Sequence, residues 1–280
     1  MVSVSTEDML EFETLLVEVS TRFVNLPAGE VDEQIENGLK RIVSISDVDR
    51  AALYQFSKDK TELRVTHSWA VEGIERLPEI VADERWPYAV GLLRRGETWN
   101  FSRLEEVPGD ATAERQYLET TGIRSGLAIP LQVGEQLVGA LSIVTFRQER
   151  IWPTELVQRL RMLGEAFANA LIRKRFEEDL SAEKQFSASV IESLPGLFFM
   201  MDEESRYIRW NKNVEDLMGY SADVLPSTLA LSTVSPKDRA RATKAVEEGF
   251  KKGHTTIEYL QSMKDGQDVP HLATAKRATI

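Results

Sequence analysis

The stretch that most constrains the fold of this chain runs from Pro153 to about Leu194. Pro153 suits the first position of a helix, and the sequence contains no glycine or proline between Gly164 and Pro195. The sequence therefore predicts a long connecting helix over 153–194, on the order of 60 Å long at about 1.5 Å per residue.

The first half of this helix is apolar on more than one side. Steps of three or four residues place one stripe of large apolar side chains along it, which we predict to form a dimer and signalling surface: Leu156, Leu160, Leu163, Phe167 and Leu171. We expect the helix to contact both a sheet of its own domain and the same helix of a second subunit, as a coiled coil in a parallel homodimer. The alternative is an ordinary terminal helix followed by a solvated linker, because the apolar spacing is not a strict heptad.

Length and composition limit the classes of function. A chain of 280 residues is long enough for two domains, and its net charge of −11 argues against nucleic acid as a partner. The absence of cysteine excludes thiol catalysis, cysteine-ligated zinc and any cofactor attached through sulfur. The longest apolar run, Leu197 to Met201, is too short to span a bilayer, and the first ten residues do not resemble a secretory signal. We therefore expect a cytoplasmic protein without a membrane span.

The strongest β signal is GIRSGLAIPLQVGEQLVGALSIVTF, from Gly122 to Phe146, where apolar residues alternate on both sides of the turn at Gly134. Gly139 in its second half predicts a close approach to a neighbouring backbone. The preceding residues predict helices over 5–25, 31–43, 89–96 and 111–121 and strands over 49–56, 62–69 and 97–101. This order predicts an α+β fold, with one antiparallel sheet that has helices on one face and a pocket under loops on the other.

Residues 1–175 resemble a GAF domain, a small-molecule sensing module of signalling proteins. The resemblance is carried by the hairpin TGIRSGLAIPLQVGEQLVGALSI and by RIWPTELVQRLRMLGEAFANALIRKR, which follows it. Residues 189–280 resemble a PAS domain that is incomplete at its C-terminal end. The matching features are a strand pair over 197–201 and 206–209, the Trp210-Asn211 step, Glu215, the Gly219-Tyr220 pair and the turn from Lys264 to Gly266. The resemblance implies a second antiparallel sheet flanked by helices.

The GAF resemblance implies a ligand pocket roofed by loops and a short helix. The candidate binding residues are Trp69, Trp86, Tyr88, Trp99, Phe101 and Tyr117, with Arg85, Arg94 or Arg124 nearby. Aromatic walls beside a guanidinium suit a planar or anionic ligand. The alternative is that these aromatic side chains only fill the core. A cysteine-linked bilin is excluded, and the signature of the cyclic-nucleotide-binding members is absent.

The PAS resemblance implies a second cavity, with candidates Phe198, Met200, Trp210, Asn211, Leu217, Tyr220 and Tyr259. The cysteine that forms a flavin adduct is absent. Haem would need an axial ligand, for which His271 is a better candidate than His254, although a lone histidine on a strand, such as His67, usually has a structural role. We expect no metal site, and the cofactor is unknown.

Motifs for catalysis are missing: the sequence has no Walker loop, no H-E-x-x-H pair and no nucleophile elbow. Methionine sulfoxide reduction by GAF relatives depends on cysteine and does not fit. We therefore expect these residues to be the non-enzymatic input region of a bacterial signalling protein, most similar to a two-component sensor histidine kinase, with its output domain absent from these residues. The alternatives are the input region of a cyclic-di-GMP synthase/hydrolase or of a transcription activator, or a ligand-free dimerisation scaffold.

Overall fold

The computed structural model describes residues 6–278, and the chain divides between Asp179 and Leu180 into two compact units. The first unit begins with two helices, continues with five strands and three short helices, and ends in the first part of a long helix. Its elements are α1 (Thr6–Val24), α2 (Val31–Ile45), β1 (Arg50–Phe56), β2 (Leu63–Ala70), α3 (Ala82–Arg85), α4 (Pro87–Arg94), β3 (Trp99–Phe101), α5 (Thr112–Thr121), β4 (Ser125–Val133), β5 (Gln136–Thr145) and α6 (Thr154–Glu192). The predicted α+β class is confirmed.

The five strands form one antiparallel sheet in the order β2-β1-β5-β4-β3. β4 and β5 are the predicted hairpin, and Gly134 in its turn has a φ of 60°, in the left-handed region that glycine adopts without strain. Gly139 pairs with Gln55 of β1 and with Leu131 of β4. A Cβ atom at Gly139 would lie 2.0 Å from the backbone oxygen of Tyr54, so the predicted close approach of two backbones is confirmed.

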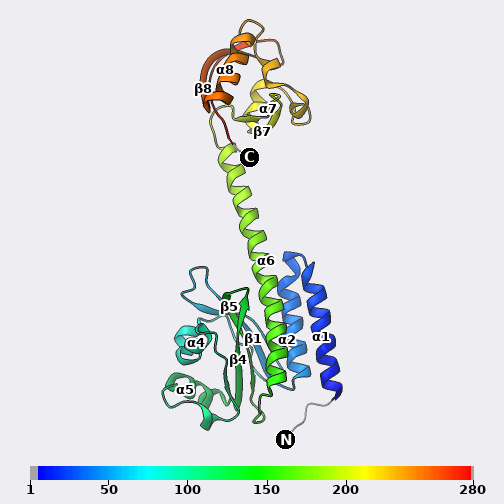
Figure 1. Cartoon of the computed structure of the whole chain (residues 1–280), viewed down its shortest axis with the longest axis vertical. Helices are drawn as coiled ribbons and strands as arrows, with labels where there is room; N and C mark the ends of the chain where they lie inside the picture. The colour runs from blue at the N-terminus through cyan, green and yellow to red at the C-terminus, as the bar shows by residue number, and fades with distance from the viewer. Residues whose placement is uncertain (1–5, 279–280) are drawn as a thin grey trace. The chain divides into compact units, whose positions relative to one another are not determined.

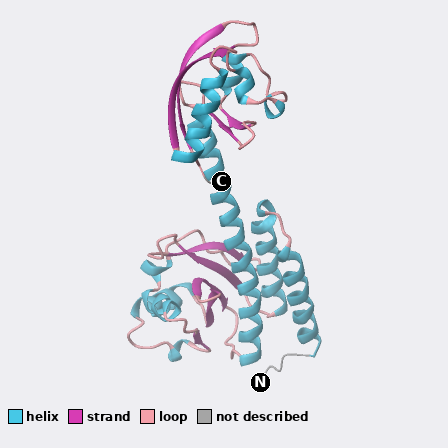
Figure 2. Ribbon diagram, turned by 45° about the horizontal axis from the view of Figure 1, so that its top comes forward, coloured by secondary structure: helices cyan, strands magenta, loops and turns pink. Residues whose placement is uncertain are grey.

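Figure 1 shows α1, α2 and the first part of α6 packed side by side on one face of this sheet, with α4 and α5 on the other face. Figure 2 shows the same three helices from a second direction. Between helices and sheet lies the largest core of the unit, with fully buried side chains from every layer: Leu15, Ile35, Leu39, Leu131, Leu141, Leu160 and Leu163.

Phe167 on α6 fits into a notch on α2. Its ring is fully buried and lies 5.4 Å from the ring of Phe23. A Cβ atom at Gly38 would lie 2.4 Å from the ring of Phe167, so the ring occupies space that only glycine leaves free. The same notch brings α1, α2 and α6 into one packed layer.

The second unit contains two two-stranded antiparallel sheets with helices beside them. Its elements are β6 (Phe199–Met201), β7 (Tyr207–Trp210), α7 (Lys212–Met218), α8 (Arg239–Lys252), β8 (His254–Ser262) and β9 (Asp268–Lys276). Gly219 ends α7 in the left-handed conformation, with a φ of 78°. One core gathers around Tyr207, Val214 and Met218, and a smaller one around Val234, Ala242 and Tyr259.

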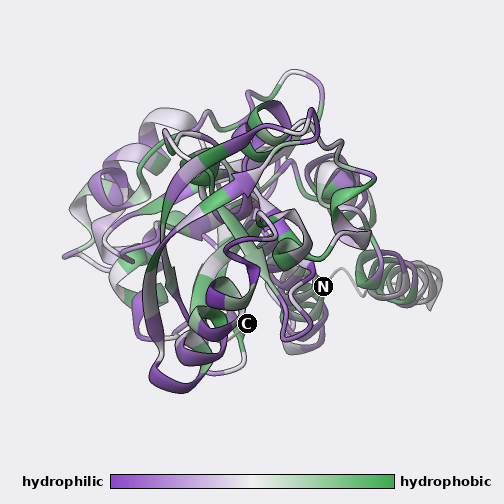
Figure 3. Cartoon of the chain, turned by 90° about the horizontal axis from the view of Figure 1, so that it is seen from above, coloured by the Kyte–Doolittle hydropathy of each residue, from purple (hydrophilic) through white to green (hydrophobic). Residues whose placement is uncertain are grey.

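Hydropathy along the chain follows these packing requirements. In Figure 3 hydrophobic and hydrophilic residues alternate along the helices and strands, as expected for elements with one packed and one exposed side. Within residues 6–278, no helix combines the length and the apolar character that crossing a membrane requires.

Candidate functional site

The candidate site is a cavity on the face of the sheet opposite the helical layer. The free space inside it is about 60 Å³. Its wall is built by β1, β2, β4 and β5 of the sheet, by α3, α4 and α5, and by β3: Arg50, Tyr54, Leu63, Leu77, Ala82, Trp86, Ala89, Val90, Leu93, Trp99, Phe101, Tyr117, Leu118, Ile123, Gly126, Leu127, Ala128, Ser142 and Val144. Most of these side chains are apolar, so the cavity favours an apolar body.

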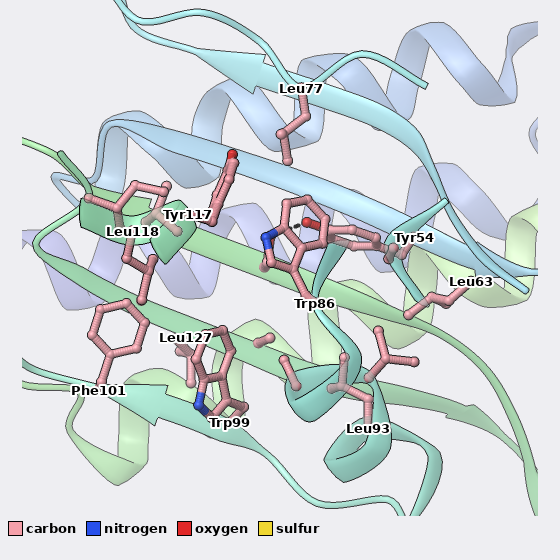
Figure 4. A pocket seen from close by; sticks show the side chains of 18 of the residues that line it. Tyr54, Leu63, Leu77, Trp86, Leu93, Trp99, Phe101, Tyr117, Leu118 and Leu127 are labelled. Atoms are coloured by element: carbon pink, nitrogen blue, oxygen red, sulfur yellow. Dashed lines mark hydrogen bonds between the residues drawn. The ribbon is translucent and has the colours of Figure 1, made fainter. Parts of the chain in front are cut away.

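Aromatic rings from different elements surround the cavity (Figure 4). Trp86 lies between α3 and α4, and its ring meets that of Tyr117 on α5 edge to face at 5.2 Å. The ring of Tyr54 on β1 lies 6.1 Å from Trp86 in a similar arrangement. Trp99 and Phe101 of β3 close the other side, with 5.2 Å between their rings. Such tilted pairs are favourable ring geometries, and they leave little empty space.

Four predicted residues share this cavity: Trp86, Trp99, Phe101 and Tyr117. The structure places the other four elsewhere. Trp69 packs at the edge of the helical layer, with Arg76 over its ring at 4.0 Å. Tyr88 packs beside α5 behind the cavity wall.

Two predicted arginines also lie outside the wall. Arg94 binds the carboxylate of Asp83 and the backbone oxygens of Lys60 and Thr61. Arg124 is exposed and directly precedes β4. Arg85 lies near the wall, 5.7 Å from the ring of Tyr117.

The polar residues of the wall are not among the residues predicted from the sequence. Arg50, Tyr54 and Ser142 line the cavity, and Ser142 donates a hydrogen bond of 3.3 Å to the Tyr54 hydroxyl. Burial raises the pKa of Tyr54 to about 12, so its hydroxyl stays protonated at neutral pH. Alternation along β1 is the signal that could have found Arg50, because Arg50, Ala52, Tyr54 and Phe56 share one side of the strand.

A buried carboxylate holds the roof in place. Glu114 of α5 is 1% exposed, and its Oε1 accepts the backbone N–H groups of Tyr88, at 2.7 Å, and Ala89, at 3.1 Å. These groups belong to the first turn of α4, where backbone N–H groups lack helical acceptors. The bond fixes α4, and with it Trp86, against α5.

A second buried carboxylate joins the cavity side of β1 to the segment before α6. Asp49 is 3% exposed, and it accepts hydrogen bonds from the backbone N–H groups of Phe146, at 2.6 Å, and Arg147, at 3.1 Å, and from the Arg147 guanidinium. Burial alone raises the pKa of Asp49, but these bonds outweigh it and hold the pKa below its usual value. Trp152 adds a hydrogen bond of 3.0 Å from its indole N–H to the backbone oxygen of Phe101.

The three histidines have ordinary protein partners or surroundings. His67 on β2 lies 3.3 Å from Asp32 of α2, which also binds Lys174 of α6. Burial lowers the pKa of His67, although the nearby Asp32 opposes this shift. His271 on β9 lies 3.0 Å from the backbone oxygen of Val269, and His254 is exposed at the start of β8. Within the described residues, no three His, Asp or Glu side chains gather as a metal site would require.

The PAS candidates do not form one cluster. Trp210 and Tyr220 pack against the core around Tyr207. Phe199 and Met201 contact this core, and the predicted residues Phe198 and Met200, next to them in the sequence, do not belong to it. Leu217 is 58% exposed, and Tyr259 belongs to the separate smaller core.

Asn211 has a structural function. Its side chain is fully buried, accepts a hydrogen bond of 3.0 Å from the backbone N–H of Phe198 and donates one of 2.7 Å to the backbone oxygen of Gly196.

The five predicted dimer residues of α6 lie inside the core of the first unit. Leu156, Leu160, Leu163, Phe167 and Leu171 are between 0% and 8% exposed and pack against the same chain. α1 and α2 supply the helical partner that the sequence reasoning assigned to a second subunit. The large apolar side chains of α6 that are exposed are others, namely Met162, Phe176, Leu180, Phe186 and Val190.

Comparison with known families and proteins gives matches for both units. The sequence model of the GAF domain family matches residues 30–171, and that of the PAS fold family matches residues 207–276. The circadian input-output histidine kinase CikA of Thermosynechococcus vestitus is 24% identical over 181 residues, which are 61% of this chain and 24% of that protein. The chain therefore spans about a quarter of the length of this curated relative.

Solved structures share the fold. The phycocyanobilin-bound GAF domain from a cyanobacterial phytochrome is similar, with a TM-score of 0.50 and 19% identity, over 59% of this chain and 96% of that one. The photosensory core module of the Stigmatella aurantiaca phytochrome has a TM-score of 0.50 and 18% identity, over 68% of this chain and 41% of that one.

Proposed function

This chain belongs to the GAF domain family, and on that premise we propose that its first domain detects a small molecule and that α6 carries the response onward. The sequence-based prediction of a GAF domain followed by a PAS fold is confirmed, and the chain is a sensory input region of a signalling protein. We propose boundaries of 1–175 for the GAF domain, 153–194 for the connecting helix and 189–280 for the PAS domain.

The observation that carries the proposal is the aromatic cavity and its link to α6. The cavity lies on one face of the sheet, and the segment after β5 is tied to its wall through Asp49 and through the Trp152–Phe101 bond. A ligand that alters the wall therefore acts close to the base of α6. A difference in ligand affinity between two states of about 1–3 kcal/mol is enough to bias such a switch.

The test is ligand binding that depends on this cavity. We expect a small-molecule library to contain compounds that raise the melting temperature of the whole chain, because binding to the folded state stabilises it. Ala128 is buried in the cavity wall, and Ala128→Leu fills the free space, so it should abolish these shifts. Ala222→Leu, at an exposed position of the second unit, should retain them. A library without hits, or hits that persist in Ala128→Leu, would argue for a ligand-free scaffold.

We also propose that the chain forms a parallel homodimer through the exposed apolar side of α6. At roughly 100° per residue, Met162, Phe176, Leu180, Phe186 and Val190 fall within an arc of about 120°. Phe176 and Phe186 are 70% and 71% exposed. Water-exposed phenylalanines on one helix side favour burial against a second copy.

Sedimentation tests the homodimer. The wild-type chain should be a dimer at tens of micromolar, and the double variant Phe176→Glu/Phe186→Glu should be a monomer. The control Ser181→Glu/Ser189→Glu adds the same charge on the other side of α6 and should remain a dimer. A monomeric wild type, or dissociation of both variants, contradicts the proposed surface.

The similarity to the histidine kinase CikA suggests the kind of whole protein to which this chain belongs. Because the histidine kinase CikA is similar over part of its length, we propose that this chain serves as the input region of a cytoplasmic sensor histidine kinase whose output domain lies outside these residues.

A further inference from the structure

Arg50 is a buried cation in the wall of the GAF cavity. The residue is 6% exposed. Its guanidinium donates to the backbone oxygen of Glu75 at 3.2 Å and lies 3.5 Å from the Tyr117 hydroxyl. The ring of Phe146 lies 5.1 Å away. Among the side chains that the structure describes, no carboxylate lies within 4.0 Å of Arg50. Buried charges are normally paired, because an unpaired one costs desolvation free energy.

The wall also contains an unsatisfied donor, on the side away from Arg50. The indole N–H of Trp99 is buried and has no acceptor within hydrogen-bond distance in the described part of the chain. Figure 4 shows Trp99 on the β3 side of the cavity, whereas Tyr54, on the strand that Arg50 begins, lies on the other side. The wall thus offers a cation and a free donor, and its remaining surface is mostly apolar. These two groups lie on opposite sides of the cavity (Figure 4), so a ligand small enough for it reaches only one of them. Beside Arg50, such a ligand must supply a negative charge and acceptor atoms.

The size of the cavity limits the ligand further. Its free space of about 60 Å³ is well below the roughly 150 Å³ of an engineered cavity that binds benzene. We propose that the cavity binds a small organic monocarboxylate, with Arg50 holding the carboxylate and the aromatic wall enclosing a short apolar body. This inference rests on the proposed function, since it names the ligand class of the same sensory cavity.

Propionate and its uncharged amide, propionamide, test this proposal on the whole chain at matched pH and ionic strength. Propionate at ten times its dissociation constant should raise the melting temperature by about 3 °C, and propionamide should have no effect. Arg50→Met removes the charge and keeps most of the volume, so calorimetry should show a loss of propionate affinity of about 30-fold or more. Trp99→Phe removes a donor on the opposite side and should bind propionate like the wild type. Ala128→Leu fills the free space and should not bind it.

Two comparisons separate a ligand contact from a structural role. Without ligand, Arg50→Met should unfold at the same temperature as the wild type or at a higher one, because an unpaired buried charge is removed. Arg94→Met, an arginine outside the cavity wall, should bind propionate like the wild type. If Arg50→Met does not fold, the comparison of propionate with propionamide on the wild type and on Ala128→Leu still tests the proposal.

An equal response to propionate and propionamide, or no response to propionate at 50 mM, overturns the carboxylate proposal. So does an unchanged affinity for propionate in Arg50→Met. Sensing itself survives these results if neutral compounds bind the wild type and not Ala128→Leu. Sensing by this cavity fails when no compound of either kind binds, or when binding persists in Ala128→Leu.

Discussion

Alanine in place of Gly139 is expected to lower the free energy of unfolding of the GAF domain by about 3 kcal/mol. The added methyl group would lie 2.0 Å from the backbone oxygen of Tyr54, closer than any real contact. A Cβ atom has no rotamer through which to escape, so β1 and β5 must separate. Because β5 is hydrogen-bonded to both β1 and β4, the separation weakens the middle of the sheet. Tyr54 also lines the cavity, and ligand affinity should fall with stability.

Urea unfolding followed by tryptophan fluorescence measures this effect, because four of the five tryptophans belong to the first unit. Gly29→Ala is the matched control. Its Cβ atom would have no other atom within 4 Å, and its stability should change by less than about 0.5 kcal/mol. Equal stability of Gly139→Ala and wild type would show that the two strands lie further apart than described.

Phe167→Ala is expected to cost about 3–5 kcal/mol of stability. The ring is fully buried in the notch above Gly38, and its removal leaves an empty space among α1, α2 and α6 that the surrounding backbone cannot fill. The same urea titration measures the change.

Phe176→Ala provides the comparison on the same helix. Phe176 is 70% exposed, so its truncation should change the stability of the folded chain by about 0.5 kcal/mol or less at concentrations where the chain is monomeric. Similar losses in both variants would mean that Phe167 does not fill the notch.

Most of the helices and strands could be predicted from local patterns in the sequence. Alternation around Gly134 predicted the β4–β5 hairpin, and a glycine in the middle of a strand predicted the close approach at Gly139. The absence of helix breakers predicted one long helix, which the structure describes as Thr154–Glu192. These signals come from residues that are close together in the sequence, so they can be recognised without knowing the fold.

Partners across the fold were harder to assign. The stripe from Leu156 to Leu171 correctly indicated a buried face, but apolar spacing is the same whether the covering helix comes from the same chain or from another. Here α1 and α2 cover it. The exposed residues Phe176 and Phe186 became recognisable as a separate surface only once that packing was known.

The cavity was predictable in its apolar part and missed in its polar part. Large aromatic residues near the roof identified Trp86, Trp99, Phe101 and Tyr117. Arginines are usually exposed, so those in the loops, Arg94 and Arg124, were preferred over one in a strand. Arg50 differs from Arg94 and Arg124 in lying on the side of β1 that faces the cavity. The sequence does not show which face of the sheet meets the cavity, so it could not identify Arg50.

Asp49 and Arg50 are consecutive residues with different tasks. Asp49 holds the segment that leads into α6, and Arg50 belongs to the cavity wall. The Cα atoms of Asp49 and Arg50 are joined by a trans peptide and lie about 3.8 Å apart. Their side chains nevertheless contact different parts of the domain. Any displacement of the main chain at this point is therefore shared at once by the wall and by the start of the long helix, without first crossing the width of the sheet.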